Sequence, residues 1–220
     1  ARMGPGEPDR GVAARCREHH VTAVTDELYG HTRFAGDHIP MATLEGMAGR
    51  TVTISGASKT FSVTGWRVGW IVAPAELTAG IRKVHDFLTV GAPAPLQEAI
   101  VAGLALGRSY YEGLSAGYRE RRDLLLPYLE RAGFQPRVPE GAYYVLCDIS
   151  GFGFADDIAF ARWLIGAVGV AGVPGSSFYS RRELGRNLLR FTFCKTDDLL
   201  CDAGERLGRT AELAARRGSD

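Results

Sequence analysis

The stretch SGASKTFSVTGWRVGW, residues 55–70, surrounds Lys59 with small residues and places Arg67 shortly after it. A lysine acts as an amine nucleophile when its neutral form is accessible, and a small neighbour such as Gly56 leaves room for a flat ligand. Arg67 offers a forked donor that suits a phosphate group. Taken alone, a lysine in a loop is usually solvated. This chain has only three lysines against 23 arginines, so few residues are candidates for lysine chemistry. The surroundings therefore favour a reactive Lys59.

A second polar group follows the apolar run VTAVT at residues 21–25. It consists of Asp26, Glu27 and Tyr29, and it stands where the carboxyl end of a parallel strand would carry a binding loop. Taken alone, Asp26 is better explained as the cap of the next turn. The group becomes informative only together with the lysine stretch.

Three apolar runs rich in β-branched residues, at 21–25, 51–55 and 69–73, are typical of buried strands. A short helix is expected at 10–20, before the first run, and irregular or helical segments separate the others. Short apolar strands divided in this way predict an open, mostly parallel sheet that is buried on both faces. The fold class expected from the sequence is therefore α/β.

The rest of the chain also interleaves helices and strands. The pattern predicts helices at 75–90, 95–132, 156–168 and 197–216, and strands at 142–146, 170–173 and 188–194. A break at Gly91, Ala92 and Pro93 separates the first two helices. We expect a second, smaller α/β subdomain, with domains at 1–92 and 93–220.

Composition narrows the class of partner. The 26 basic and 25 acidic residues nearly cancel, so the charge favours neither nucleic acid nor an acidic membrane surface, and a small-molecule partner is expected. The four cysteines show neither metal-ligand spacing nor a disulfide framework, so we expect reduced thiols and no metal. No apolar run approaches the roughly 20 residues of a membrane span, and the first residues lack the apolar core of a signal peptide. The expected location is the cytoplasm.

Residues 56–69 resemble the lysine signature of the fold type I, class I/II aminotransferases, in the pattern G-A-S-K-x-x-S-V-x-G-x-R-V-G. Residues 26–29 match the D-E-x-Y motif of that family, in the same order and at a similar spacing. The resemblance continues through 139–144, 173–179 and 189–193. It covers nearly all of the chain after about residue 16.

Within this family, residues 62–66 and 147–150 look most like the kynurenine/glutamine/methionine transaminase branch. The resemblance implies the pyridoxal 5′-phosphate (PLP)-dependent transferase fold type I. Residues 1–92 would be the C-terminal part of the PLP-binding large domain, and 93–220 the small domain with a long linking helix. The implied reaction moves an α-amino group from an amino acid to a 2-oxo acid.

The resemblance also assigns roles around the cofactor. Lys59 would form the internal aldimine and, once released, carry a proton between the substrate α-carbon and the cofactor. Asp26 would pair with the protonated pyridine nitrogen and keep the ring an electron sink. Tyr29 would hydrogen-bond the phenolic oxygen, and Arg67 the phosphate.

Two further assignments concern Ser58 and Arg190. The first arises where this sequence differs from the family's pattern, and the second depends on the resemblance alone. Many members carry a serine three residues before the lysine, where this chain has Gly56, so we expect Ser58 to supply the serine contact to the phosphate. Arg190 would bind the substrate α-carboxylate through a two-point fork. Without the resemblance, Arg190 would be interpreted as a surface arginine at a strand edge.

The N-terminal portion of the family contains a phosphate loop, an aromatic residue that stacks on the cofactor and an N-P-x-N-P-T-G segment. None of these has a counterpart in residues 1–18. A non-catalytic fragment, or a half-enzyme that needs a complementary chain, is therefore the alternative to a complete aminotransferase. A PLP lyase of the same fold is another. A nucleotide-binding Rossmann domain is disfavoured because no G-x-G-x-x-G follows the first apolar run. The resemblance also implies a homodimer.

Overall fold

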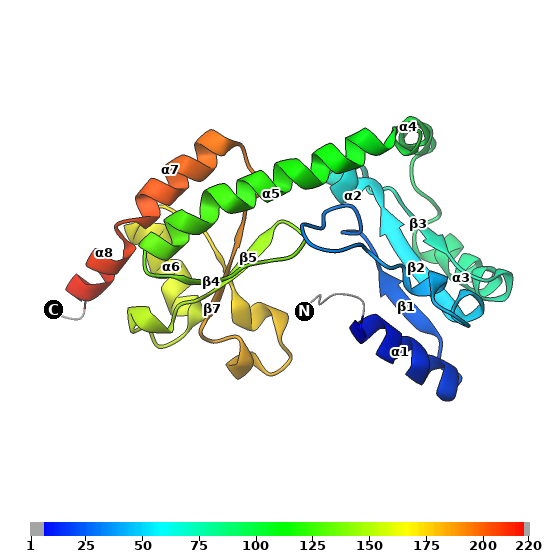
Figure 1. The fold of residues 1–220 in the computed structure, drawn as a ribbon, viewed down its shortest axis with the longest axis horizontal. Helices are drawn as coiled ribbons and strands as arrows, with labels where there is room; N and C mark the ends of the chain where they lie inside the picture. Colours follow the sequence, from blue (N-terminus) through cyan, green and yellow to red (C-terminus); the bar gives the residue numbers. More distant parts are fainter. Residues whose placement is uncertain (1–6, 218–220) are drawn as a thin grey trace. The chain divides into compact units, whose positions relative to one another are not determined.

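A computed structural model describes residues 7–217 and divides the chain into two compact units, Ala1–Ser115 and Ala116–Asp220. Figure 1 gives the elements of both units in chain order. The domain boundary expected between residues 92 and 93 stays a prediction, because compactness is a different property from independent folding.

The sheet of the first unit has the order β1-β2-β3 and is built from the three apolar runs. β1 (Ala23–Asp26) pairs in parallel with β2 (Thr51–Gly56), and β3 (Gly69–Val72) joins β2 antiparallel. The connection from β2 to β3 holds only the four-residue helix α2 (Ala57–Thr60) and a 3-10 turn, so it lacks the long crossover helix usual between parallel strands. Parallel pairing is thus present between β1 and β2 alone.

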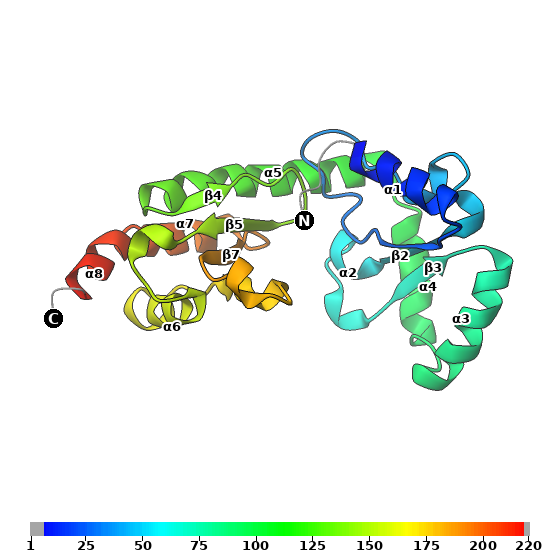
Figure 2. The ribbon, with the colours of Figure 1, turned by 90° about the horizontal axis from the view of Figure 1, so that it is seen from below.

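Several α-helices among the described residues of the first unit pack beside this sheet or its loops. α1 (Glu7–Glu18) buries Ala13 and Cys16 in one apolar cluster with residues of β1 and the segment after it. A second cluster is formed by Ala57, Val68 and Ile100, the last from α4 (Ala94–Leu104). α3 (Ala75–Leu88) lies on the β3 side of the sheet in both views of the ribbon (Figures 1 and 2), and α5 (Arg108–Arg131) begins in this unit.

The long helix expected at 95–132 is wrong as a single element, because α4 ends at Leu104 and α5 begins at Arg108. The break coincides with two glycines, Gly103 and Gly107, which are poor helix formers. The closing helix expected at 197–216 is likewise divided, near Gly208, into α7 (Asp197–Leu207) and α8 (Thr210–Arg217). Helical periodicity continues across both breaks and so conceals them.

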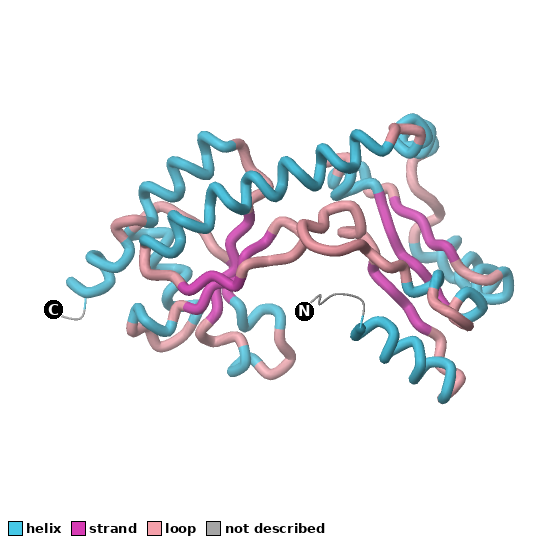
Figure 3. Tube along the Cα trace, viewed as in Figure 1, coloured by secondary structure: helices cyan, strands magenta, loops and turns pink. Residues whose placement is uncertain are grey.

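The sheet of the second unit has the order β4-β5-β7-β6, and every pairing in it is antiparallel. Its strands are β4 (Gln135–Arg137), β5 (Tyr144–Asp148), β6 (Val173–Pro174) and β7 (Leu188–Thr192), drawn in magenta in Figure 3. α6 (Asp157–Ala167) begins at a cap in which the Asp156 carboxylate accepts the Ala159 N–H at 2.7 Å. The buried core residues include Phe134, Val145, Phe160, Leu164, Leu189, Phe191 and Phe193.

No helix among residues 7–217 is long and apolar enough to cross a membrane.

Candidate active site

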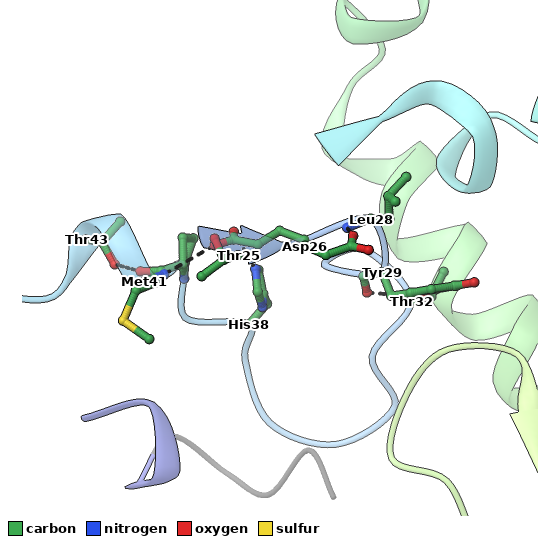
Figure 4. Close-up of polar contacts among 10 residues, drawn as sticks. Thr25, Asp26, Leu28, Tyr29, Thr32, His38, Met41 and Thr43 are labelled. Atoms are coloured by element: carbon green, nitrogen blue, oxygen red, sulfur yellow. Dashed lines mark hydrogen bonds and ion pairs between the residues drawn. The ribbon is translucent and has the colours of Figure 1, made fainter. Parts of the chain in front are cut away.

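Asp26 ends β1, where its carboxylate is exposed and its Oδ1 accepts the Leu28 N–H at 3.1 Å (Figure 4). In the parallel pairing, Asp26 stands opposite Ile54 of β2. Because β1 and β2 run in the same direction, the segment that follows β2 leaves the sheet at the same edge as Asp26. Lys59 lies on that segment. The sheet therefore brings the two motifs of the sequence to one edge.

Tyr29 is half-buried in the turn that follows Asp26. Its carbonyl oxygen accepts both the backbone N–H of Thr32, at 3.0 Å, and the Thr32 hydroxyl, at 3.1 Å. Thr32 is buried, so these hydrogen bonds are shielded from water. The backbone that carries Tyr29 is thus held in a defined turn.

Lys59 lies in the single turn of α2, directly after β2, and its side chain is half-buried. Gly56 precedes this turn, and a Cβ there would lie 3.1 Å from the Val68 carbonyl oxygen and 3.2 Å from the Gly69 Cα. Both contacts are to backbone atoms that pairing with β3 holds in place. A side chain at position 56 would therefore be tightly packed against β3, and because Gly56 has no hydroxyl, a serine contact to phosphate needs another residue.

Arg67 returns toward Ser58 through Thr64. The Arg67 guanidinium donates to the Thr64 carbonyl at 3.3 Å, and the Thr64 hydroxyl donates to the Ser58 carbonyl at 3.0 Å. Arg67 has a φ of 56° and Ser62 a φ of 55°, in the left-handed region that residues with a side chain seldom adopt. Strained backbone of this kind is concentrated at ligand sites. The loop therefore holds Arg67 in a conformation that the arginine itself does not favour.

Aromatic residues at the start of α5 support this loop. The Tyr110 hydroxyl donates to the Thr60 carbonyl at 2.7 Å, and its ring stacks on Phe61 with centroids 5.8 Å apart. Tyr111 contacts Phe61 and also His31, at centroid distances of 6.5 and 4.5 Å. Burial and the neighbouring Tyr111 raise the pKa of Tyr110. This support was not predicted, because no local pattern in the sequence connects α5 to α2.

Arg190 lies in the second unit, in β7, between β5 and β6. Its guanidinium carbon is 4.2 Å from the ring centroid of Tyr144, on β5, and 4.2 Å from that of Phe178. A cation between two aromatic faces is held by attraction to both rings while its N–H edge stays available to an anion. The alternative of a surface arginine at a strand edge is wrong, because β7 is an inner strand and Arg190 is half-buried.

The loop that carries Phe178 is anchored by Asp157. This aspartate is only 1% exposed, and its carboxylate accepts the Ser176 N–H at 2.6 Å. Ser176 and Phe178 belong to the same 3-10 turn, Gly175–Phe178. Asp157 is not predicted by any local pattern, because the contact joins residues that are far apart in the chain.

The donor set of the first unit fits a phosphorylated pyridine aldehyde. It offers a lysine amine, a carboxylate at the neighbouring strand end, a guanidinium and hydroxyl groups, and Gly56 adds no side chain beside them. A shallow surface depression beside α1 is lined by other residues, including Val12, Cys16 and Val21. Residues 7–217 contain no cluster of His, Cys, Asp and Glu that could hold a metal ion. The individual roles assigned from the resemblance stay predictions.

Comparison with known proteins identifies the family. The family described as aminotransferase class I and II matches residues 10–207. The chain belongs to the class I and II aminotransferases. This family is PLP-dependent, which agrees with the cofactor and the fold expected from the lysine signature.

Two curated aminotransferases illustrate the similarity. A probable N-succinyldiaminopimelate aminotransferase of Mycobacterium tuberculosis is 38% identical over 205 residues, which cover 89% of this chain and 52% of that protein. A kynurenine–oxoglutarate transaminase of Dictyostelium discoideum is 36% identical over 209 residues, covering 86% and 48%. The chain spans about half the length of the curated relatives it matches. The expected likeness to the kynurenine branch is confirmed, but a relative named for another amino donor is just as similar.

Solved aminotransferase structures confirm the fold. The M. tuberculosis N-succinyldiaminopimelate aminotransferase superposes with a TM-score of 0.88 at 37% identity, covering 92% of this chain and 53% of that one. An Escherichia coli protein with a methionine aminotransferase function gives 0.86 at 33% identity, covering 93% and 53%. The fold type I, class I/II architecture is therefore that of this chain.

Proposed function

We propose that this chain supplies the lysine-bearing part of a PLP-dependent aminotransferase, which moves an α-amino group from an amino acid to a 2-oxo acid. The observation that carries the proposal is the parallel pairing of β1 with β2, which brings Asp26 and the Lys59 segment to one edge of the sheet. Membership of the aminotransferase family supports the same reaction.

In this proposal, PLP supplies an electron sink for the bond that breaks at the substrate α-carbon. The Lys59 amine holds the cofactor through its aldehyde and, once free, moves the proton at the α-carbon. The Asp26 carboxylate keeps the ring nitrogen protonated, because an opposite charge favours the charged form. Tyr29 donates to the phenolic oxygen.

The phosphate and the substrate are bound by other groups. Arg67 and Ser58, which Thr64 connects, bind the cofactor phosphate. Arg190 binds the α-carboxylate of the substrate, with its guanidinium oriented by Tyr144 and Phe178. Two parallel N–H donors fix the orientation of a carboxylate as well as its position.

Covalent trapping tests the assignment of Lys59. Borohydride reduction of the protein mixed with PLP is expected to leave the cofactor on the peptide that contains Lys59, detected by mass spectrometry. The chain offers only two other lysines, Lys83 and Lys195. Lys83→Arg, in α3, is the matched control and should trap as much cofactor as the wild type. Equal labelling of all three lysines would contradict the proposal.

Transamination and elimination are separated by their products. A transaminase needs a 2-oxo acid acceptor and releases no ammonia, whereas a lyase releases ammonia with no acceptor present. A screen of amino donors against 2-oxoglutarate and phenylpyruvate, with ammonia measured in parallel, distinguishes the two. We propose transamination because the relatives are named for it.

An apolar face of α3 supports association with a further polypeptide. Val84, Phe87 and Leu88 recur at helical spacing, and their exposed fractions are 58, 92 and 78%. Neighbouring apolar side chains exposed to this extent usually mark an interface. We propose that the protein forms a homodimer. We also propose that its active site is completed by a polypeptide that corresponds to the half of the relatives which this chain does not cover. We also propose a cytoplasmic location, which the four free cysteines support.

Light scattering tests the homodimer. The wild-type protein is expected to show twice the mass of one chain, and Phe87→Asp to weaken the association at least about tenfold, because it places a charge in an apolar contact. Since Phe87 is exposed, the melting temperature of the dissociated protein should not fall. Val12→Asp, at another exposed apolar residue, is the control. A monomeric wild type would refute the homodimer.

A further inference from the structure

The Glu27 carboxylate joins β1, the loop that follows it and the 3-10 turn Met41–Thr43. Its Oε1 accepts the Thr25 hydroxyl at 2.9 Å and the Met41 N–H at 3.3 Å, and its Oε2 is 2.9 Å from the His38 Nε2. The side chains of Glu27 and His38 are 11 and 29% exposed. Figure 4 shows His38 and Met41 beside the end of β1. One partly buried carboxylate therefore closes a loop of the active-site edge.

The His38 ring also packs against the turn that carries Tyr29. A Cβ at Gly30 would lie 2.9 Å from the His38 Cδ2 and 3.3 Å from its Nε2. The Gly30 N–H donates to the Glu27 carbonyl at 3.2 Å, which closes the turn. A side chain at position 30 would therefore displace the His38 imidazole from its present place.

Glu27 stands between two predicted cofactor ligands without being one of them. Its backbone N–H donates to the Ile54 carbonyl at 2.8 Å, which fixes the chain to β2 directly after Asp26. Asp26 in turn accepts the Leu28 N–H, within the turn that leads to Tyr29. The Glu27 side chain thus belongs to the residue that joins Asp26 to the turn carrying Tyr29.

We propose that Glu27 and His38 are a pair of positioning residues that hold Asp26 and Tyr29 in the geometry needed to bind the cofactor ring. This inference rests on the proposed function. Neither side chain touches the cofactor in it, and both act through the turn at residues 26–30. Displacements of about 1 Å at a site cost up to about 100-fold, so a loosened turn has a measurable effect.

His38→Leu and His38→Gln, made in this chain of 220 residues, separate positioning from general packing. His38→Leu removes the partner of Glu27, whereas the glutamine side-chain amide can donate to the same oxygen. In His38→Leu we expect the Leu28 amide to exchange its hydrogen about tenfold faster and the affinity for PLP, measured by absorbance titration, to fall about tenfold. His38→Gln should restore both values to within about threefold of the wild type. His85→Leu, on the exposed surface of α3, is the matched control.

Gly30→Ala provides a second variant that removes no polar group. Its Cβ pushes the His38 ring away from the turn, so the same two measurements should change in the same direction. Gly49→Ala, where a Cβ meets no atom within 4 Å, is the control. Gly30→Ala also tests the inference if His38→Leu fails to fold.

The outcomes are distinct. If the wild type binds PLP through Lys59 but His38→Leu and Gly30→Ala bind it equally well, the positioning role is wrong and the proposed function stands. Faster exchange at Leu28 with unchanged affinity also overturns the inference, because the pair is then structural only. If PLP gives the same absorbance spectrum with the wild type as with a variant that lacks Lys59, the proposed function is wrong. The positioning inference is then wrong as well.

Discussion

Lys59→Arg is expected to lower kcat/KM for transamination by roughly 10⁴-fold or more. Arginine keeps the positive charge and nearly the length of lysine, but its guanidinium is not deprotonated in proteins and neither forms the bond to the cofactor nor accepts a proton. Lys59 is half-buried in α2, and α2 contains no second lysine that could replace it. Steady-state kinetics with a responsive amino donor measures the loss.

The control for this change is Lys83→Arg, because Lys83 is exposed on α3 and has no role in the proposed reaction. Its kcat/KM should stay within about twofold of the wild-type value. Equilibrium dialysis measures how much PLP the Lys59→Arg variant binds. It shows whether the activity is lost because the reaction is blocked or because the cofactor is no longer bound. A Lys59→Arg variant with one-tenth or more of the wild-type activity would contradict the proposed function.

Gly175→Ala is expected to cause the largest loss of stability among the substitutions considered. A Cβ at Gly175 would lie 2.5 Å from the Leu188 Cβ, 2.7 Å from the Leu188 carbonyl oxygen and 2.8 Å from the Gly185 carbonyl oxygen. Backbone atoms cannot move aside as a flexible side chain does, so we expect the free energy of unfolding to fall by about 3 kcal/mol or more. Urea unfolding followed by circular dichroism measures this value.

The same substitution has a consequence for Arg190. Gly175 begins the 3-10 turn that carries Phe178, so a displaced turn moves one of the two rings that hold the guanidinium. Gly166→Ala is the matched control in the same unit, because a Cβ there meets no atom within 4 Å. It lies in α6 and should stabilise the protein by about 0.5 kcal/mol. Equal stability of the two variants would show that the backbone around Gly175 yields easily.

The parts of the site that the sequence predicted are those that depend on local pattern. Apolar β-branched runs marked β1 and β2, and in parallel strands the residues that follow each run meet at one edge. That rule places the ends of β1 and β2, one of which carries Asp26 and the other of which precedes Lys59, on the same side of the sheet. Family resemblance was needed only for the roles, since strand ends carry many kinds of polar residue.

The parts that the sequence did not predict depend on contacts between distant residues. His38 reaches Glu27 across an irregular loop, and the rings around Arg190 come from a neighbouring strand and a separate turn. β4 escaped prediction because it is short and contains Pro136, which a sheet tolerates at its edge. Nothing in the spacing of these residues reveals which of them will meet.

The left-handed backbone at Arg67 sets stability and function against each other. An arginine in this conformation costs on the order of 1–3 kcal/mol, most of which a glycine would avoid. Directed evolution for heat resistance alone would therefore drift toward glycine at position 67, and the resulting protein would have lost its forked donor. A screen of this chain for thermostable variants therefore needs a parallel selection for cofactor binding. Without it, the screen will enrich variants that are more stable but bind the cofactor less tightly.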